Sequence, residues 1–132
     1  MSATNNTPKS AAATFVPSRI ITCVIPDDGT DRRLMRTLRD EHNILTADST
    51  PCRGIAMLRP VRTRPGRLPE SEMVRMVEII VPADEAHELF EHIHEIAGIG
   101  EASGGAMWLS RTISATRYTL PDDVADEEMQ EK

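Results

Sequence analysis

The sequence is poor in aromatic residues, and this shortage limits how large a core the chain can build. It has one Trp, one Tyr and two Phe among 132 residues. A domain of this size buries only about two thirds of the surface that its unfolded chain exposes. Association between subunits would cover apolar surface that a monomer leaves in water. We therefore expect a single domain that forms an oligomer.

Cysteine and long hydrophobic runs are also scarce. The two cysteines, Cys23 and Cys52, are too few for a secreted disulfide framework and lack the spacing of metal ligands. The sequence contains no signal-peptide core and no run of about 18 apolar residues. These absences predict a soluble, cytoplasmic protein.

Lysine is nearly absent, because Lys9 and Lys132 are the only lysines among 15 basic residues. Every cation between them is a planar guanidinium, which suits paired hydrogen bonds to phosphate or carboxylate, although GC-rich codon usage would give the same bias. The net charge of −6 arises largely at the C-terminal end, from Asp122, Asp123, Asp126, Glu127, Glu128 and Glu131. The central part of the chain is therefore close to neutral.

The two ends differ in composition from the centre. Residues 1–18 are rich in Ser, Thr, Ala and Asn and show no hydrophobic period, while residues 121–132 are strongly acidic. Both compositions are typical of disordered segments. We predict disordered tails at 1–18 and 121–132, and one folded domain over residues 19–120.

The first half of this domain has the pattern of a strand, a helix and a strand. The apolar, β-branched run at residues 20–25 predicts a buried strand. A helix capped by Thr30 or Asp31 follows and ends near His42, and residues 44–50 predict a second strand that stops at Pro51.

The second half repeats this order. Residues 73–81 predict a strand that is apolar on both faces. Pro82-Ala83-Asp84 begins a helix that ends at Gly98, and its apolar stripe consists of Ala86, Leu89, Phe90, Ile93, Ile96 and Ala97. A glycine-rich turn at 98–105 leads to further β-like runs, the last at 113–118.

Two such repeats predict an α+β, ferredoxin-like fold, with an antiparallel sheet and both helices on one face. The other face also carries apolar residues. We therefore expect subunits to pack through it, as a homotrimer.

A loop of unusual length joins the two halves. Residues 52–71 contain three prolines and two glycines, and an acid-free stretch holds Arg53, Arg59, Arg62, Arg64 and Arg67. Loops of this length in small domains are often binding elements. Mutually repelling guanidinium groups favour an anion, whereas a solvated, mobile loop without a ligand is the alternative. Nucleic acid is disfavoured, because the loop has no aromatic residue for stacking and the tail is acidic.

Several segments resemble the PII signal-transduction family. IITCVIPDDGTDRRLMRTLRDEHNILTADSTPCRGI, at residues 20–55, is similar to the first half of those proteins and leads into their long T-loop. VEIIVPADEAHELFEHIHEIAG, at 77–98, and SGGAMWL, at 103–109, resemble the second-half strand and helix and the glycine-rich B-loop. The likeness covers residues 19–120, with a T-loop at about 53–72.

The resemblance implies a homotrimer that binds an adenine nucleotide in clefts between subunits. It also implies that the T-loop contacts a membrane transporter or a cytosolic enzyme. The implied nucleotide-binding residues are Arg53, Gly54, Ile55, Ser103, Gly104, Gly105, Ala106 and Arg117. The implied anion- or partner-binding residues of the loop are Arg59, Arg62, Arg64 and Arg67.

The chain departs from the family at several positions. Ala106 replaces the B-loop lysine, Thr119 replaces an arginine of the last strand, and Val74 replaces a basic residue at the loop base. With fewer cations, ADP or AMP is favoured over ATP. The loop also lacks the tyrosine and glutamine associated with nitrogen sensing. The resemblance therefore points first to the branch of the family that acts with carboxysomes and bicarbonate transport. Members of that branch bind a nucleotide together with bicarbonate.

Other readings of the sequence remain open. The glycine-rich turn could be a plain helix stop and hairpin, since it has no phosphate-binding fingerprint. His87, Glu91 and His94 could share a helix face, which would suit a metal-binding trimer resembling the CutA family, although a solvated face is the simpler reading. A scaffold protein without a ligand is a third possibility. No Ser, Cys or His forms a recognisable catalytic set, so we expect no enzyme, no cofactor and no metal site.

Overall fold

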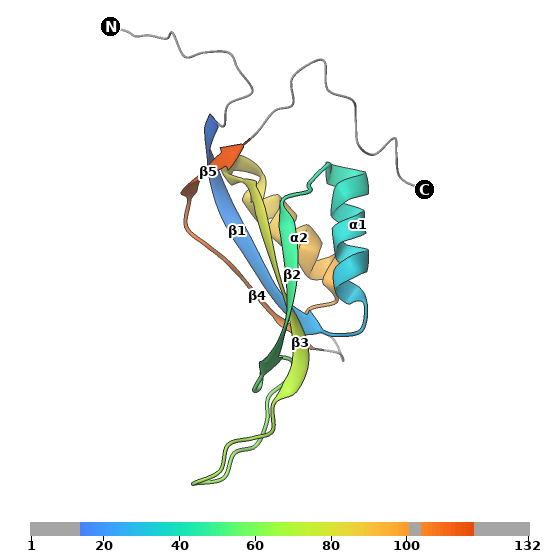
Figure 1. Ribbon diagram of the computed structural model, residues 1–132, viewed down its shortest axis with the longest axis vertical. Coiled ribbons are helices and arrows are strands. Elements are labelled where there is room, and N and C mark those ends of the chain that lie inside the picture. The colour runs from blue at the N-terminus through green and yellow to red at the C-terminus, as the bar shows by residue number, and fades with distance from the viewer. Residues whose placement is uncertain (1–13, 101–103, 118–132) are drawn as a thin grey trace, which may run out of the picture. The chain divides into compact units, whose positions relative to one another are not determined.

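The computed structural model describes residues 14–100 and 104–117. The described residues between 17 and 113 belong to one compact unit, and residues 14–16 with 114–117 belong to another. The elements follow in the order β1 (Thr14–Pro26), α1 (Thr30–His42), β2 (Ala47–Gly54), β3 (Glu72–Pro82), the 3-10 helix η1 (Ala83–Glu85), α2 (Ala86–Ala97), β4 (Ala106–Leu109) and β5 (Ile113–Arg117) (Figure 1).

The strands form an antiparallel sheet in the order β2-β3-β1-β4, and β5 pairs with β1 outside this path. The central strands β1 and β3 pair along most of their length, with Ile21 opposite Ile79 and Cys23 opposite Val77. This order, with one helix after β1 and one after β3, is the ferredoxin-like arrangement. The predicted α+β fold class is confirmed, and the homotrimer stays a prediction.

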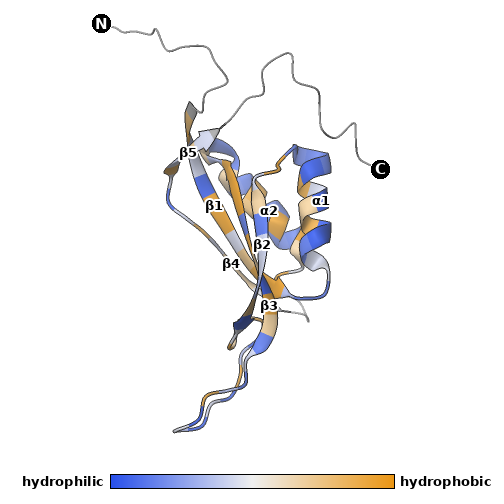
Figure 2. Ribbon diagram, in the orientation of Figure 1, coloured by the Kyte–Doolittle hydropathy of each residue, from blue (hydrophilic) through white to orange (hydrophobic). Residues whose placement is uncertain are grey.

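Both helices cover the same face of the sheet, and the main core lies between the two layers (Figure 2). Alternate residues of the central strands point toward the helices, as the period of two requires. They pack against a stripe of each helix. The core residues with no exposed surface are Ile21, Cys23, Ile25, Leu34, Leu38, Val77, Ile79, Ala86 and Ile93. Phe90 and Ile96 pack at the margin of this core, so the predicted stripe of α2 is confirmed.

Helix α1 begins differently from the prediction. Neither Thr30 nor Asp31 caps it, because Gly29, with a φ of 96°, occupies the cap position. The Asp28 carboxylate instead accepts hydrogen bonds from the hydroxyl of Thr30 at 2.6 Å and from its amide at 3.1 Å. These hydrogen bonds lower the pKa of Asp28 from its usual value. The predicted ends are correct, since Asn43 and Gly98 follow α1 and α2 in left-handed conformations.

Two strand boundaries also differ from the prediction. Strand β1 begins at Thr14, ahead of the predicted start of order at Arg19. Strand β2 begins at Ala47 and continues through Pro51 to Gly54, so the predicted strand at 44–50 was placed too early. β2 lies at the edge of the sheet, where a proline does not remove a hydrogen bond to a second neighbour.

The face of the sheet opposite the helices carries large apolar side chains among polar ones and is partly exposed. Trp108 is 45% exposed and Ile80 is 37% exposed. A depression in this region is lined by Ile20, Thr46, Ala47, Asp48, Glu78 and Ile80. The prediction that both faces of β3 are substantially apolar is confirmed.

No helix in the described ranges is both long and apolar enough to cross a membrane.

Leu38 and Leu45 offer a matched test of the core. Leu38 is fully buried, whereas Leu45 is 69% exposed. Leu38→Ala should lower the free energy of unfolding by about 2–5 kcal/mol, because it leaves a cavity between α1 and the sheet. Leu45→Ala should change it by less than about 0.5 kcal/mol. Urea denaturation of both variants measures the difference, and equal losses would contradict this account of the core.

The two cysteines should react very differently with thiol reagents. Cys23 is fully buried, and this burial raises its pKa to about 12. Its thiol therefore stays protonated and inaccessible at pH 8, while the partly exposed Cys52 can react. We expect one fast-reacting thiol in the native protein and none in Cys52→Ser. Fast labelling that persists in Cys52→Ser would contradict this placement.

Candidate functional site

The loop between β2 and β3, residues 55–71, extends beyond the end of the sheet as a narrow hairpin (Figure 1). At its tip the amide of Arg67 donates a hydrogen bond to the carbonyl of Arg64 at 3.1 Å. Pro65 and Gly66 form the corner, and Gly66 has a φ of 77°. Pro followed by Gly is the preferred sequence of a type II turn. The tip is therefore shaped by its own sequence.

The base of the loop is anchored in a small second cluster. Leu58 is 6% exposed and packs with Val24 and Val74 on the sheet face away from the helices. Its carbonyl accepts a hydrogen bond of 2.9 Å from the amide of Gly105. Two segments far apart in sequence, the loop base and the glycine-rich turn, are thus joined through main-chain atoms.

Gly104 makes this close approach possible. A Cβ at this position would overlap the carbonyl oxygen of Leu58, and the φ of Gly104 is 77°. Only glycine combines this backbone conformation with the absence of a side chain. The glycine-rich turn therefore does more than end helix α2 at Gly98, because it also packs closely against the loop base.

The structure places most of the predicted nucleotide-binding residues on two segments, the end of β2 and the turn before β4, which are linked by the hydrogen bond between Leu58 and Gly105. Gly54 lies at the end of β2, immediately before the loop base, and Ile55 follows it with 41% of its surface exposed. Gly104, Gly105 and Ala106 lead into β4. Ser103 lies outside the described residues. Arg117 ends β5, but its side chain is also outside the described part, so its predicted role stays a prediction.

The loop arginines are not equivalent. Arg59 forms an ion pair with Glu72, the first residue of β3, at 3.2 Å. The other four are exposed, and none has an ion-pair partner within the ranges that the structure describes: Arg53, Arg62, Arg64 and Arg67. The sequence showed the acid-free stretch but not this pairing. The charge that the loop offers to an anion therefore comes from the remaining arginines.

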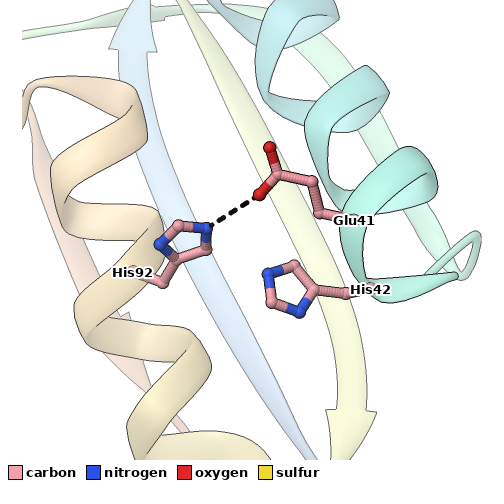
Figure 3. Close-up of side chains that lie close together, drawn as sticks. All are labelled: Glu41, His42 and His92. Atoms are coloured by element: carbon pink, nitrogen blue, oxygen red, sulfur yellow. Dashed lines mark ion pairs between the residues drawn. The ribbon is translucent and has the colours of Figure 1, made fainter.

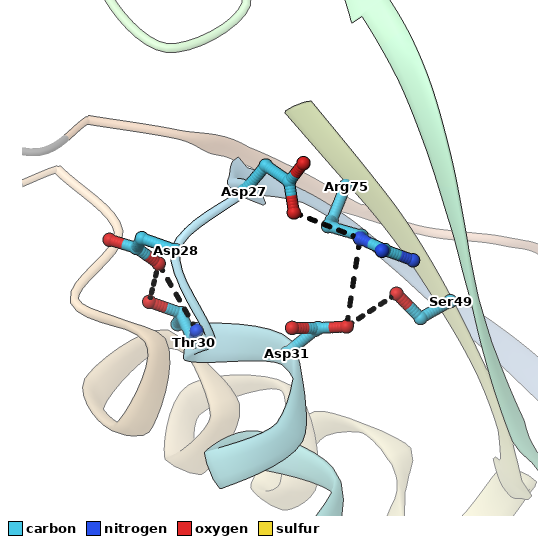
Figure 4. A network of polar contacts seen from close by, with 6 residues as sticks. All are labelled: Asp27, Asp28, Thr30, Asp31, Ser49 and Arg75. Atoms are coloured by element: carbon cyan, nitrogen blue, oxygen red, sulfur yellow. Dashed lines mark hydrogen bonds and ion pairs between the residues drawn. The ribbon is translucent and has the colours of Figure 1, made fainter. Parts of the chain in front are cut away.

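A polar network fixes the neighbouring end of the sheet (Figure 4). The Nε of Arg75 in β3 lies 3.1 Å from Asp27 and 3.9 Å from Asp31. The hydroxyl of Ser49 in β2 donates to Asp31 at 2.8 Å. These contacts tie the start of α1 to two strands. The charge of Arg75 is balanced by Asp27 and Asp31, so this arginine holds the strands and the start of α1 together.

The histidines predicted as an alternative metal site do not form one in the described residues. The metal-compatible group there consists of Glu41, His42 and His92. His87 instead lies 3.4 Å from a guanidinium nitrogen of Arg19. The sequence analysis missed this group because its members come from different helices. The adjacent pair Glu41-His42 at a predicted helix end was the one available signal.

Comparison with solved structures shows a likeness in fold. The chain resembles Arabidopsis thaliana PII bound to citrate, with a TM-score of 0.53 and 15% identity, over 72% of this chain and 74% of that chain. It also resembles a DUF3240 family protein from Shewanella baltica OS155, with a TM-score of 0.51 and 12% identity, over 71% and 88% of the two chains. The sequence matches no protein-family model and no curated protein. At these identities, the protein shares the fold of PII-like proteins, as the resemblance predicted.

Gly104 and Gly66 provide a matched pair for testing the loop contact. Both have a φ of 77°, but an added Cβ meets Leu58 only at Gly104 and meets nothing at Gly66. Gly66→Ala should cost roughly 1–2 kcal/mol of stability, the usual penalty for this conformation. Gly104→Ala should cost more and should abolish exchange protection of the Gly105 amide. Urea denaturation and amide hydrogen exchange measure these effects, and equal behaviour of the two variants would contradict the contact.

Proposed function

We propose that the protein is a PII-like regulatory protein and not an enzyme. In this proposal it binds an adenine nucleotide, ADP or AMP in preference to ATP, with or without bicarbonate. The nucleotide lies in clefts between the subunits of a homotrimer. The loop 55–71 then contacts a membrane transporter or a cytosolic enzyme, in inorganic-carbon uptake or carboxysome function. The observation that carries the proposal is the hydrogen bond between Leu58 and Gly105.

This hydrogen bond offers a direct way for a ligand to move the loop. The amide of Gly105 is the kind of donor that a phosphate oxygen accepts from a glycine-rich turn. In the described structure the carbonyl of Leu58 occupies it. A phosphate that took this amide would release Leu58 and change the path of the loop base. The ligand would act by binding one loop arrangement more tightly than the other.

The distribution of charge supports a small anionic ligand. Arg53, at the end of β2, is exposed and next to the loop base, while Ala106 contributes no cation beside the glycine turn. This modest number of cations suits one or two phosphates better than three. A bicarbonate ion could bridge a guanidinium group through paired hydrogen bonds. Citrate, which the similar Arabidopsis protein binds, is a further anion to test.

The exposed sheet face supports the trimer. Ile80 and Trp108 are large apolar residues that a monomer leaves partly in water. Contact between such faces would bury them, and ligand clefts would then lie at the borders between subunits. A solution mass equal to one chain would contradict this part of the proposal.

Calorimetry with ADP, AMP and ATP, each with and without bicarbonate, tests the nucleotide site. We expect ADP or AMP to bind, and Arg53→Ala to weaken binding at least about tenfold, since a charge-assisted hydrogen bond to phosphate is lost. Arg36→Ala is the matched control, because Arg36 is also an exposed arginine but lies on helix α1. Its affinity for the nucleotide should match that of the wild type.

Loop movement is followed in the same samples by tryptic cleavage after Arg62. The cleavage rate should change when the nucleotide binds. Absence of heat with every nucleotide, on folded oligomer, would overturn the proposal. An unchanged melting temperature across the nucleotides would then favour the ligand-free scaffold.

A further inference from the structure

Three side chains with metal-binding atoms converge where the end of α1 passes α2 (Figure 3). Glu41 and His42 are the last two residues of α1, and His92 lies in the middle of α2. One potential ligand atom from each side chain lies within 4.8 Å of the other two. The imidazole rings of His42 and His92 have centroids 5.0 Å apart and meet edge to face at 69°.

The core fixes the positions of these residues. Helix α1 ends at His42 because Asn43 adopts a left-handed conformation with a φ of 55°. On α2, His92 precedes Ile93, which is fully buried in the same core as Leu38 of α1. The helix surfaces that carry the three side chains are therefore held in place by packing. A site built on rigid elements loses little conformational entropy when it binds an ion.

One atom of the cluster lacks a hydrogen-bond partner. The Nε2 atom of His92 is buried, and no partner is found for it among the described residues. The nearest carboxylate oxygen, Oε1 of Glu41, is 3.5 Å away, which is longer than a good hydrogen bond. Buried ring nitrogens in folded proteins nearly always have a partner, whether protein, water or ion. An ion held between Glu41 and His92 would give this nitrogen a partner.

We propose that Glu41, His42 and His92 form a binding site for a divalent transition metal, of which Zn²⁺ and Cu²⁺ are the best candidates. Two imidazoles and one carboxylate match the preferences of these ions, whereas Mg²⁺ and Ca²⁺ prefer all-oxygen ligands. Tetrahedral Zn²⁺ with bonds of about 2.0–2.1 Å requires ligand atoms roughly 3.3 Å apart. Rotations of the exposed Glu41 and His42 side chains would bring the three atoms to this spacing.

Solvent exposure decides what kind of site this is. The side chain of Glu41 is 60% exposed, and that of His92 is 35% exposed. Three protein ligands leave a fourth position for water, so the ion can enter and leave directly from solvent. Bound metal would link the end of α1 to the middle of α2. The site does not depend on a nucleotide or on the loop, which emerges beside the start of α1, where Asp31 approaches Arg75.

The alternative is a simple ion pair between Glu41 and a protonated His92. The two readings differ in their response to metal, because neutral imidazole binds metal and protonated imidazole does not. An ion pair would be unaffected by added Zn²⁺. A metal site should bind one Zn²⁺ per chain and lose affinity as the pH falls.

The test uses the untagged full chain without nucleotide. Calorimetry with Zn²⁺ should show one site per chain, and both His92→Ala and Glu41→Gln should weaken it at least about tenfold, as loss of a ligand does. Because Glu41 is exposed, Glu41→Gln should keep the fold even where His92→Ala does not. With Cu²⁺, electron paramagnetic resonance should report two nitrogen ligands in the wild type and one in His42→Ala.

The matched control is the double variant His87→Ala/His94→Ala, which removes two other histidines from the same helix. It should keep the wild-type affinity, and so should Cys52→Ser. Failure of the wild type to bind stoichiometric Zn²⁺ or Cu²⁺ would overturn the proposal. Binding that survives in Glu41→Gln and His92→Ala, or that disappears in the double variant, would also overturn it. None of these outcomes bears on nucleotide binding.

Discussion

The central strands β1 and β3 carry apolar side chains on both faces, and the two helices can cover only one of them. The helix-facing residues form the main core, which fixes the register of the sheet and the positions of α1 and α2. On the other face, Leu58 from the loop covers Val24 and Val74 near one end. Ile80 and Trp108 remain partly exposed farther along this face. The second face thus anchors the loop base and leaves large apolar side chains partly exposed.

Buried apolar side chains and surface ion pairs contribute to this domain in different ways. A buried Leu or Ile contributes about 1.5–3 kcal/mol, whereas an exposed ion pair contributes about 0–1 kcal/mol. The stability of the domain therefore comes mainly from the core, whereas the ion pairs mainly orient the segments that they join. The pair of Arg59 with Glu72 holds the loop close to the start of β3, and Arg75 orients the start of α1 through Asp27. Arg62, Arg64 and Arg67 on the loop have no ion-pair partner in the described part of the chain, and neither do Arg32 and Arg36 on α1.

Much of the fold could be predicted because it follows from local patterns. The stripe of α2, the two-sided apolar pattern of β3 and the helix ends at Asn43 and Gly98 are each encoded within a few residues. The boundary at Pro51 was wrong because it depends on β2 being an edge strand, which is a property of the whole sheet. The capping of α1 was wrong because Asp28 acts across a glycine whose conformation the sequence leaves open.

The candidate sites were harder to predict, because they depend on contacts between distant segments. The glycine turn was identified from sequence, but its contact with Leu58 was not, since a buried leucine in a polar loop has no periodic signal. Likewise, the Glu41, His42 and His92 group exists only because two helices pack side by side. The likeness to Arabidopsis thaliana PII agrees with the resemblance seen in the sequence, but it extends only to the fold. The residues that would bind a ligand have to be identified from this chain itself.

The link between the loop and the glycine turn is made by main-chain atoms, a carbonyl at Leu58 and an amide at Gly105. It requires an apolar side chain at one position and the absence of a side chain at Gly104, but it places no demand on the residues of the loop tip. Substitutions at the tip can therefore accumulate without breaking the connection. The residues of a hairpin tip attached in this way can change while the attachment of the loop base to the glycine turn is kept.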